Sequence, residues 1–308
     1  MPPNATAIIL SFSSSSVVIG LSPSLSPQHT IPMPPSVNNL YHLATKINPK
    51  TPVEANPLLP FFVSITHRLN VADQTLPFYI HTVTFTPPTL FTTLTTSAIL
   101  SLYHLPAPLP PSLLTFRHGP SVSLCSLGLT SGLTISLSPH STLIQCTSSS
   151  YPIPLSSITL PLTTSHLRDM IGDTESKIDL TSSPSQIDFI LDAFSLTIFT
   201  SSKHTHNSDY SSEQNLLSSC IRSLLSVSLD DRISVSSSII FTSECPEWLS
   251  LFESRQVSEY FCRKLKDKYD DTVGGVSKII FEVKRGGGDK FYRGMSVIAA
   301  VDALNINN

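Results

Sequence analysis

Two pairs of short apolar runs, each pair separated by a polar turn, stand out in the pattern of the chain. The first pair lies in residues 7–21, and the second lies in residues 132–145. Buried strands joined by a tight polar turn form a β-hairpin, so we expect one hairpin at each place. Helical patterns follow both hairpins, which predicts a weak internal duplication of a ββ(β)–α unit.

The remaining segments alternate between strand and helix patterns, which indicates an α/β fold. Steps of three and four residues between apolar positions predict helices at 90–105, 186–199, 213–227, 247–269 and 295–304. Short apolar runs predict strands at 30–32, 59–66 and 233–242, a strand or a helix end at 79–84, an inserted strand or two within 113–127, and a hairpin that pairs 278–283 with 290–292 around the glycines 286–288.

Charge is sparse and unevenly placed along the chain. Only 13% of the 308 residues are charged, whereas serine and threonine together number 80. Residues 1–166 carry six of the 41 formal charges (19 basic and 22 acidic). Abundant apolar residues and a net charge of −3 exclude a highly charged disordered chain and disfavour a basic nucleic-acid-binding face. A long, nearly neutral half predicts a surface that a protein partner covers.

We expect neither an export signal nor a membrane span. The apolar runs of 5–22 lack a preceding basic region, and hydroxyls and prolines break the uncharged stretch 118–166. The five cysteines are scattered, and no two form a C-x-x-C pair, which is typical of reduced thiols in an intracellular protein.

The order of these motifs resembles that of actin and the actin-related proteins. Residues 7–21 are similar to the strand, phosphate loop and strand that open the family's sequences, and residues 98–103 (A-I-L-S-L-Y) are similar to its A-V-L-S-L-Y helix end. The span 132–171 resembles the family's second phosphate hairpin and the helix after it. Further similarity lies at 223–225, 230–232, 239–243 and 293–299. The matches are collinear and cover most of the chain.

The resemblance implies an actin-like (RNase H-like) two-lobed α/β fold with reduced outer subdomains. The first lobe would span 1–129 and the second 130–289, and 290–308 would return to the first lobe. The outer subdomains would be reduced to 34–56 and 166–212, and 104–129 would be an insertion.

The turns that hold phosphate and Mg²⁺ in active family members differ in this chain. Where the family has D-x-G-x-G and D-x-G-D-G, this chain has S-F-S-S-S from Ser11 and S-L-S-P-H from Ser136. Serine is a neutral and shorter acceptor than aspartate, it resists the positive φ that glycine adopts, and Pro139 has no N–H for a phosphate. Aspartate is absent from the whole of 1–72, an observation that does not depend on the alignment.

Other positions that serve the nucleotide in the family are changed as well. The lysine that follows the first turn in the family is a valine here, and the glutamine near the helix end is Ser97. The histidine that follows the second turn is Leu143, and the family's Gly-Gly-Thr turn is replaced by a segment that begins with Ser-Glu. The degenerate positions are Ser11, Ser13, Ser15, Val18, Ser136, Ser138, Pro139, His140, Ser243 and Glu244. Losing several charge-assisted contacts of about 1.5–3 kcal/mol each predicts that ATP and Mg²⁺ binding is lost or weak. We therefore expect no cofactor, no metal and no catalytic residue.

Two other chemistries have little support in the sequence. There is no G-x-S-x-G motif for a Ser/His/Asp hydrolase, and His204-Thr205-His206 is interpreted as an exposed loop rather than a metal site.

The resemblance implies a non-catalytic structural subunit. Short, degenerate family members look most like the divergent actin-related protein at the pointed end of dynactin, which implies capping of an actin-like filament and support of dynein-based transport. The partners would be actin-related filament protomers and dynactin pointed-end subunits in a cytoplasmic, cytoskeletal hetero-oligomer. Alternatives are a nuclear actin-related subunit of a chromatin-remodelling complex, a residual ATP-binding enzyme of the actin and sugar-kinase superfamily, and a Ser/Thr-rich secreted β-protein.

Overall fold

The structure, a computed structural model, divides the chain into two compact units. It describes residues 5–12, 16–37, 56–82, 89–137, 141–160, 216–243, 249, 252, 254–275, 277–284 and 290–306. The first unit combines 1–128 with 287–308, and the second spans 129–286. The lobes expected from the sequence are 1–129 with 290–308, and 130–289.

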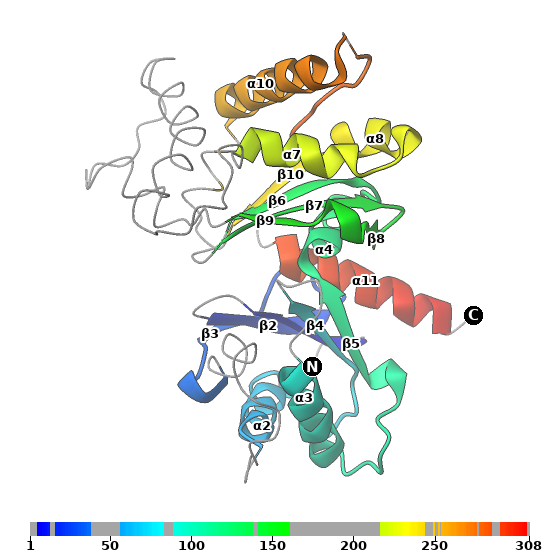
Figure 1. Cartoon of the computed structure of the whole chain (residues 1–308). Helices are drawn as coiled ribbons and strands as arrows, with labels where there is room; N and C mark the ends of the chain where they lie inside the picture. Colours follow the sequence, from blue (N-terminus) through cyan, green and yellow to red (C-terminus); the bar gives the residue numbers. More distant parts are fainter. Residues whose placement is uncertain are drawn as a thin grey trace, which may run out of the picture. The chain divides into compact units, whose positions relative to one another are not determined.

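The first unit is built on a five-stranded mixed sheet (Figure 1). Its strands are β1 (Ala7–Phe12), β2 (Ser16–Ser22), β3 (His29–Pro32), β4 (Phe78–Thr82) and β5 (Leu114–His118). They lie in the order β3-β2-β1-β4-β5, in which β1, β4 and β5 are parallel and the β1–β2 and β2–β3 pairs are antiparallel. The short helix η1 (Pro111–Leu113) leads into β5.

Helices cover both faces of this sheet. The helices are α2 (Leu58–Arg68), α3 (Thr89–Leu102), α4 (Gly119–Cys125) and α11 (Lys290–Ile306). Because side chains alternate along a strand, Ile8 and Leu10 belong to the core shared with α2 and α3, whereas Ile9 packs with α4 and α11. The chain's last helix therefore completes the core of its first unit.

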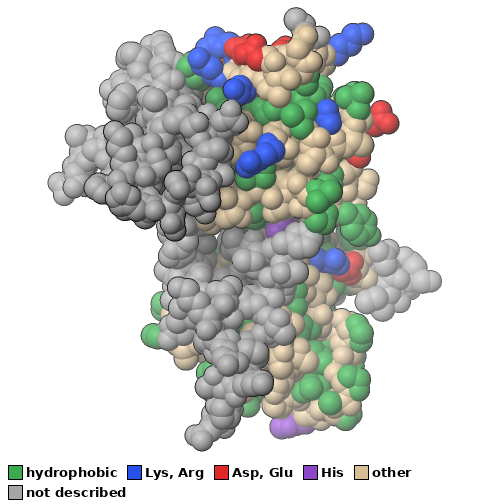
Figure 2. Space-filling model, in the orientation of Figure 1, with side chains coloured by type: hydrophobic (Ala, Val, Ile, Leu, Met, Phe, Trp, Pro, Cys, Tyr) green, Lys and Arg blue, Asp and Glu red, His purple; other side chains and the backbone are tan. Residues whose placement is uncertain are grey.

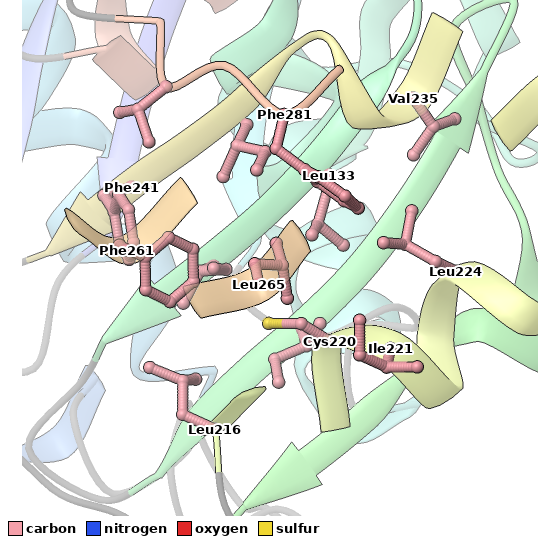
Figure 3. Close-up of a cluster of buried hydrophobic side chains, with 14 of the residues drawn as sticks. Leu133, Leu216, Cys220, Ile221, Leu224, Val235, Phe241, Phe261, Leu265 and Phe281 are labelled. Atoms are coloured by element: carbon pink, nitrogen blue, oxygen red, sulfur yellow. The ribbon is translucent and has the colours of Figure 1, made fainter. Parts of the chain in front are cut away.

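The second unit has a similar sheet with helices over one face. Its strands are β6 (Gly132–Leu137), β7 (Thr142–Ser148), β8 (Tyr151–Pro152), β9 (Ile158–Leu160) and β10 (Ile239–Ser243). They lie in the order β10-β6-β7-β8, and β9 also pairs with β7. The other elements are η2 (Pro154–Ser156), α7 (Leu216–Leu225), α8 (Leu229–Ser236) and α10 (Arg255–Val273). Figure 3 shows side chains of α7 and α10 meeting those of β6 and β10 in one apolar cluster.

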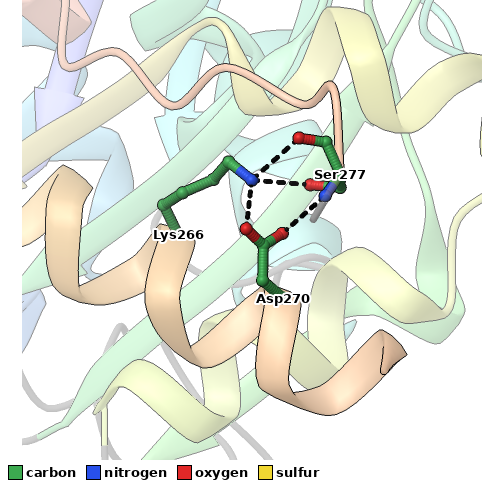
Figure 4. Close-up of polar contacts among 3 residues, drawn as sticks. All are labelled: Lys266, Asp270 and Ser277. Atoms are coloured by element: carbon green, nitrogen blue, oxygen red, sulfur yellow. Dashed lines mark hydrogen bonds and ion pairs between the residues drawn. The ribbon is translucent and has the colours of Figure 1, made fainter. Parts of the chain in front are cut away.

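Residues 277–284 lie beside β10, and hydrogen bonds between Ser277 and both Lys266 and Asp270 join them to α10 (Figure 4). Ile239 and Val283 form a parallel bridge, which adds this segment to the edge of the sheet. The Lys266 ammonium contacts the Asp270 carboxylate and donates to the Ser277 carbonyl at 2.9 Å, and the Ser277 N–H donates to Asp270 at 3.0 Å. These hydrogen bonds, led by that from Lys266, lower the pKa of Asp270 to about 2.

The two sheets repeat one another in register. In the first hairpin Ala7 pairs with Ser22 and Phe12 with Val17, and in the second every pair carries numbers 125 higher, from Gly132 with Thr147 to Leu137 with Thr142. The strands β3 and β9 each pair antiparallel with the second strand of the hairpin, and β4 and β10 each pair parallel with the first. The short strand β8, which precedes β9, has no counterpart among the described strands of the first unit. The predicted duplication is therefore present in the strand pairing.

Several predicted elements are confirmed within the described residues. The hairpins at 7–21 and 132–145, the strand at 30–32 and the helices at 90–105, 213–227 and 295–304 appear as β1–β2, β6–β7, β3, α3, α7 and α11. The ambiguous segment 79–84 falls on β4 as far as Thr82. The helix expected at 247–269 falls largely on α10, and the one expected at 186–199 lies outside the described residues.

Three predicted elements are wrong. Residues 59–66 form α2 instead of a strand, because Leu58, Phe61, Phe62 and Ile65 at helical spacing all face the core. Residues 233–236 belong to α8, which Ser228 caps, so the strand begins only at Ile239. Residues 290–292 open α11 and form no hairpin with 278–283.

The range 104–129, expected as an insertion, contains an integral edge of the first sheet. β5 pairs with β4 over five residues, and α4 packs against the same sheet face as α11. Helix α3, which includes most of the A-I-L-S-L-Y segment, lies between β4 and β5 in the chain order. The expected outer subdomains 34–56 and 166–212 lie almost entirely outside the described residues.

Candidate functional site

The carboxyl ends of the parallel strands form the candidate site of each unit. In open α/β sheets, ligand sites lie outside this edge. In the first unit β1, β4 and β5 end here, and Ser11, His81 and Arg117 are neighbours across the three strands. In the second unit β6 and β10 end here, and Ser136 is the neighbour of Thr242.

A serine faces an aliphatic residue at the equivalent position of both hairpins. Ser11 is paired across the strands with Val18, and Ser136 is paired with Leu143. Both serines are buried, being 5% and 8% exposed. The structure thus brings together residues at which the family resemblance placed an acid beside a lysine or a histidine. Each pair presents one hydroxyl and no charge.

The other predicted positions divide between described and undescribed residues. Ser243 ends β10 and is paired with Leu137, one residue after Ser136. The six others lie outside the described residues: Ser13, Ser15, Ser138, Pro139, His140 and Glu244.

Two buried histidines at this edge of the first unit were not singled out from the sequence. His81 is fully buried, its Nδ1 lies 3.5 Å from the Ser11 Oγ, and its ring stacks on Phe291 with centroids 4.1 Å apart. Burial, and secondarily the nearby His118, lowers the pKa of His81 to about 3, and burial lowers that of His118 to about 4. Both imidazoles are therefore neutral near pH 7. The sequence feature that could have identified His81 is its position at the end of an apolar run that forms the buried strand β4.

This arrangement does not assemble a nucleophilic site among the described residues. A serine nucleophile needs a closely bonded histidine that a third group orients, and the Ser11–His81 contact is at the limit for a hydrogen bond. The Asp302 carboxylate, on the same face, instead accepts from the Tyr79 hydroxyl at 2.9 Å and pairs with Arg117 at 3.4 Å. Desolvation and this hydrogen bond raise the pKa of Tyr79 to about 12, so its phenol stays protonated.

The described cysteines are equally unsuited to catalysis. Burial raises the pKa of the thiols of Cys125, Cys146, Cys220 and Cys262, so all four are protonated at neutral pH. A pocket of about 540 Å³ beside Cys262 is lined by Glu282 and Lys284, which pair with each other at 2.7 Å. The described residues hold no group of three His, Cys, Asp or Glu side chains placed to bind a metal ion.

Charge is concentrated in the second unit. On the face shown in Figure 2, lysine, arginine and acidic side chains gather over the region of α10. The exposed basic residues of this helix are Arg255, Arg263, Lys264 and Lys268. Within the described residues, no helix is both long and apolar enough to cross a bilayer. No protein-family model matches the chain, and no curated protein matches its sequence.

Proposed function

We propose that this chain is a non-catalytic structural subunit with an actin-like (RNase H-like) two-lobed fold, which acts by associating with other proteins. The repeated strand pairing supports the fold part of the proposal. Each unit opens with an antiparallel hairpin, adds a third antiparallel strand, and places a later parallel strand beside the first.

The observation that carries the loss of catalysis is the pairing of Ser11 with Val18 and of Ser136 with Leu143. A site for Mg²⁺ and phosphate needs carboxylates to balance the metal and cations or free N–H groups to balance the phosphate. Both hairpins offer a neutral hydroxyl and an alkyl side chain instead. No residue of the described strand ends restores an acid, since the neighbours are His81 and Thr242.

The charge distribution supports a role in assembly. The first unit, 1–128 with 287–308, carries ten of the 41 formal charges, so a partner that covers it would remove few charged side chains from water. We place the chain with actin-related filament protomers, at the pointed end of the actin-like filament of dynactin, in the cytoplasm. This assignment rests on the family resemblance of the motifs.

A nucleotide titration tests the loss of ATP binding. The purified full chain is titrated with Mg·ATP by calorimetry, with actin as the positive control. We expect no saturable heat up to millimolar ATP, because neither hairpin supplies charge-assisted contacts. Binding near one ATP per chain would support the residual ATP-binding enzyme and contradict the proposal.

Affinity purification tests the assembly. The tagged chain is isolated from its native cells, and the subunits that co-purify are identified by mass spectrometry. We expect dynactin subunits in fixed ratio to the chain. Recovery of chromatin-remodelling subunits instead would support the nuclear alternative, and recovery of neither would contradict the proposed partner class.

A further inference from the structure

A groove of the second unit separates α10 from the outer edge of the sheet. Residues 277–284 form this edge beside β10. Ser258, Glu259 and Cys262 of α10 line one wall of the groove, and residues 281–284 line the other. Its volume of about 540 Å³ lies within the range of about 300–1,000 Å³ that is usual for ligand sites. We call it the edge groove.

The edge segment is extended, and alternate residues of its backbone serve opposite sides. Its side chains alternate between exposed and buried from residue 278 to Val283. Toward β10, Glu282 accepts from the Ile239 N–H at 2.8 Å, and the Lys284 N–H donates to the Ile239 carbonyl at 2.7 Å. Because successive residues of a strand direct their N–H and C=O groups to opposite edges, those of Phe281 and Val283 point away from β10.

The groups that point away from β10 meet little protein. Within the part of the chain that the structure describes, the Phe281 N–H and C=O have no hydrogen-bond partner. The Val283 backbone hydrogen-bonds the Cys262 thiol, and sulfur is a weak partner. Both residues also line the edge groove. The groove therefore offers a ligand a backbone donor and acceptors at strand spacing.

We propose that the edge groove binds an extended peptide segment of a partner protein, which adds one strand to the sheet beside Phe281 and Val283. An extended backbone carries the donors and acceptors that a strand edge requires, at the same spacing. The four residues 281–284 span about 13 Å, which corresponds to about four residues of peptide. Because α10 forms the opposite wall, we expect a single strand and not the sheet of a second copy. This site goes beyond the proposed function, since it would serve any partner that carries such a segment.

Both walls of the edge groove are fixed before a ligand binds. At one end of the segment, the Ser277 carbonyl accepts from Lys266, and the Ser277 N–H donates to Asp270 of α10. At the other end, Val283 forms the parallel bridge with Ile239. A preformed site loses little conformational entropy when it binds, so a short peptide can suffice.

The charges of the edge groove favour a basic peptide. Its lining carries two carboxylates, Glu259 and Glu282, and one ammonium, Lys284. Lys284 pairs with Glu282 at 2.7 Å, whereas Glu259 pairs with Arg255, which is not part of the lining. The Arg255 and Glu259 side chains are 78% and 63% exposed, and such pairs contribute little. We therefore expect the peptide to place a lysine or arginine against Glu259.

Binding of synthetic peptides to the full chain tests this inference. The probe is the acetylated and amidated peptide Thr-Val-Lys-Val-Thr, and the matched control is the same peptide with every amide nitrogen methylated. Calorimetry measures affinity, and hydrogen exchange followed by NMR measures protection of the Phe281 amide. We expect saturable binding of the probe and at least about tenfold more protection of this amide. The methylated peptide should bind at least about tenfold more weakly, because it cannot donate to the edge.

Charge reversal tests where the peptide lies. Replacing the peptide's lysine by glutamate should weaken binding to the wild type by about threefold, and Glu259→Lys should reverse this preference. Asp271→Lys makes the same charge change at an exposed position of α10 outside the lining, and it should keep the wild-type preference.

Four results would overturn the proposal. These are a lack of saturable binding up to millimolar probe, equal binding of the methylated peptide, protection confined to amides outside the edge segment, and an equal change of preference in Glu259→Lys and Asp271→Lys. The two peptides are compared on the unmodified chain, so that comparison stands even if a variant does not fold.

Discussion

At the scale of single residues, several buried serine hydroxyls donate to backbone carbonyls, which helps a serine-rich chain form a core. Ser123 and Ser223 are fully buried, and Ser123 donates to the Pro120 carbonyl at 2.8 Å while Ser223 donates to that of Ser156 at 2.7 Å. Ser126 and Ser226 donate to the carbonyls three residues earlier in the same way. A hydroxyl that bonds nearby backbone avoids the cost of an unpaired buried polar group.

Gly20 shows how closely α11 approaches the first sheet. A Cβ at this position would overlap the phenol of Tyr292, which is fully buried and donates to the Leu21 carbonyl at 3.4 Å. We expect Gly20→Ala to lower the free energy of unfolding by about 1–3 kcal/mol through overpacking. Urea denaturation measures the change.

Two variants test this explanation. Gly275→Ala is the matched control, since nothing lies within 4 Å of its added Cβ, and it should change stability by less than about 0.5 kcal/mol. Combining Gly20→Ala with Tyr292→Phe should cost less than the sum of the two single changes, because the overlapping hydroxyl is gone. Strict additivity would show that the overlap is not the cause.

At the scale of elements, local pattern decided most helices, and long-range packing decided the exceptions. Residues 58–68 contain the β-branched and aromatic residues that favour strands, yet they form α2 because Phe62 and Ile65 fit the core against Phe78 and its neighbours. The α8 segment is similar. Ser228 accepts from the Asp231 N–H at 3.2 Å, so a helix begins at Leu229 and continues into the stretch 233–242, whose apolar residues suggested a strand.

Arg232 of α8 secures the end of α7. Its guanidinium donates to the carbonyls of Leu225 and Val227, at 2.9 Å each, and its third contact is the Tyr269 hydroxyl of α10 at 3.5 Å. We expect Arg232→Lys to lower the free energy of unfolding by about 1–3 kcal/mol, because an ammonium cannot reproduce the planar fork. Thermal denaturation measures it. Arg222→Lys on the exposed side of α7 is the control, and an equal loss there would contradict the capping role.

At the scale of the whole molecule, the chain closes its first unit with its last helix. Tyr79 of β4 and Asp302 of α11, 223 positions apart, are joined by a 2.9 Å hydrogen bond, and Ser22 and Ser296 are joined by a 3.0 Å bond. Ala7, Ile9 and Tyr79 of the sheet are buried in one apolar cluster with Tyr292, Met295 and Ala299 of α11. The first unit therefore depends on residues that lie far from its other elements in the sequence.

Removing α11 should affect the two units unequally. In a chain ended at residue 286, we expect hydrogen-exchange protection of β1 and β4 to fall by at least about tenfold, because apolar surface of Ile9 and Tyr79 becomes exposed. β6 and β10 keep their own core and should retain protection. Equal losses in both units would contradict this division of the chain.

The hairpin part of the candidate site was predictable from the sequence, and the histidine part was not. Polar turns between apolar runs set the register that pairs Ser11 with Val18 and Ser136 with Leu143, because a tight turn fixes which residues oppose each other. His81 comes next to Ser11 only through parallel pairing of β4 with β1, across a separation of 70 residues. No local rule specifies such a partner.

By itself, the sequence determined the two hairpins, their equal turn lengths and the uncharged chemistry at their ends, because each depends on residues near one another in the chain. The tertiary structure alone decided that 104–129 supplies a sheet edge and that α11 packs on the first unit over His81. These features depend on contacts between distant segments, whose energies come from burying surface that the local pattern does not identify.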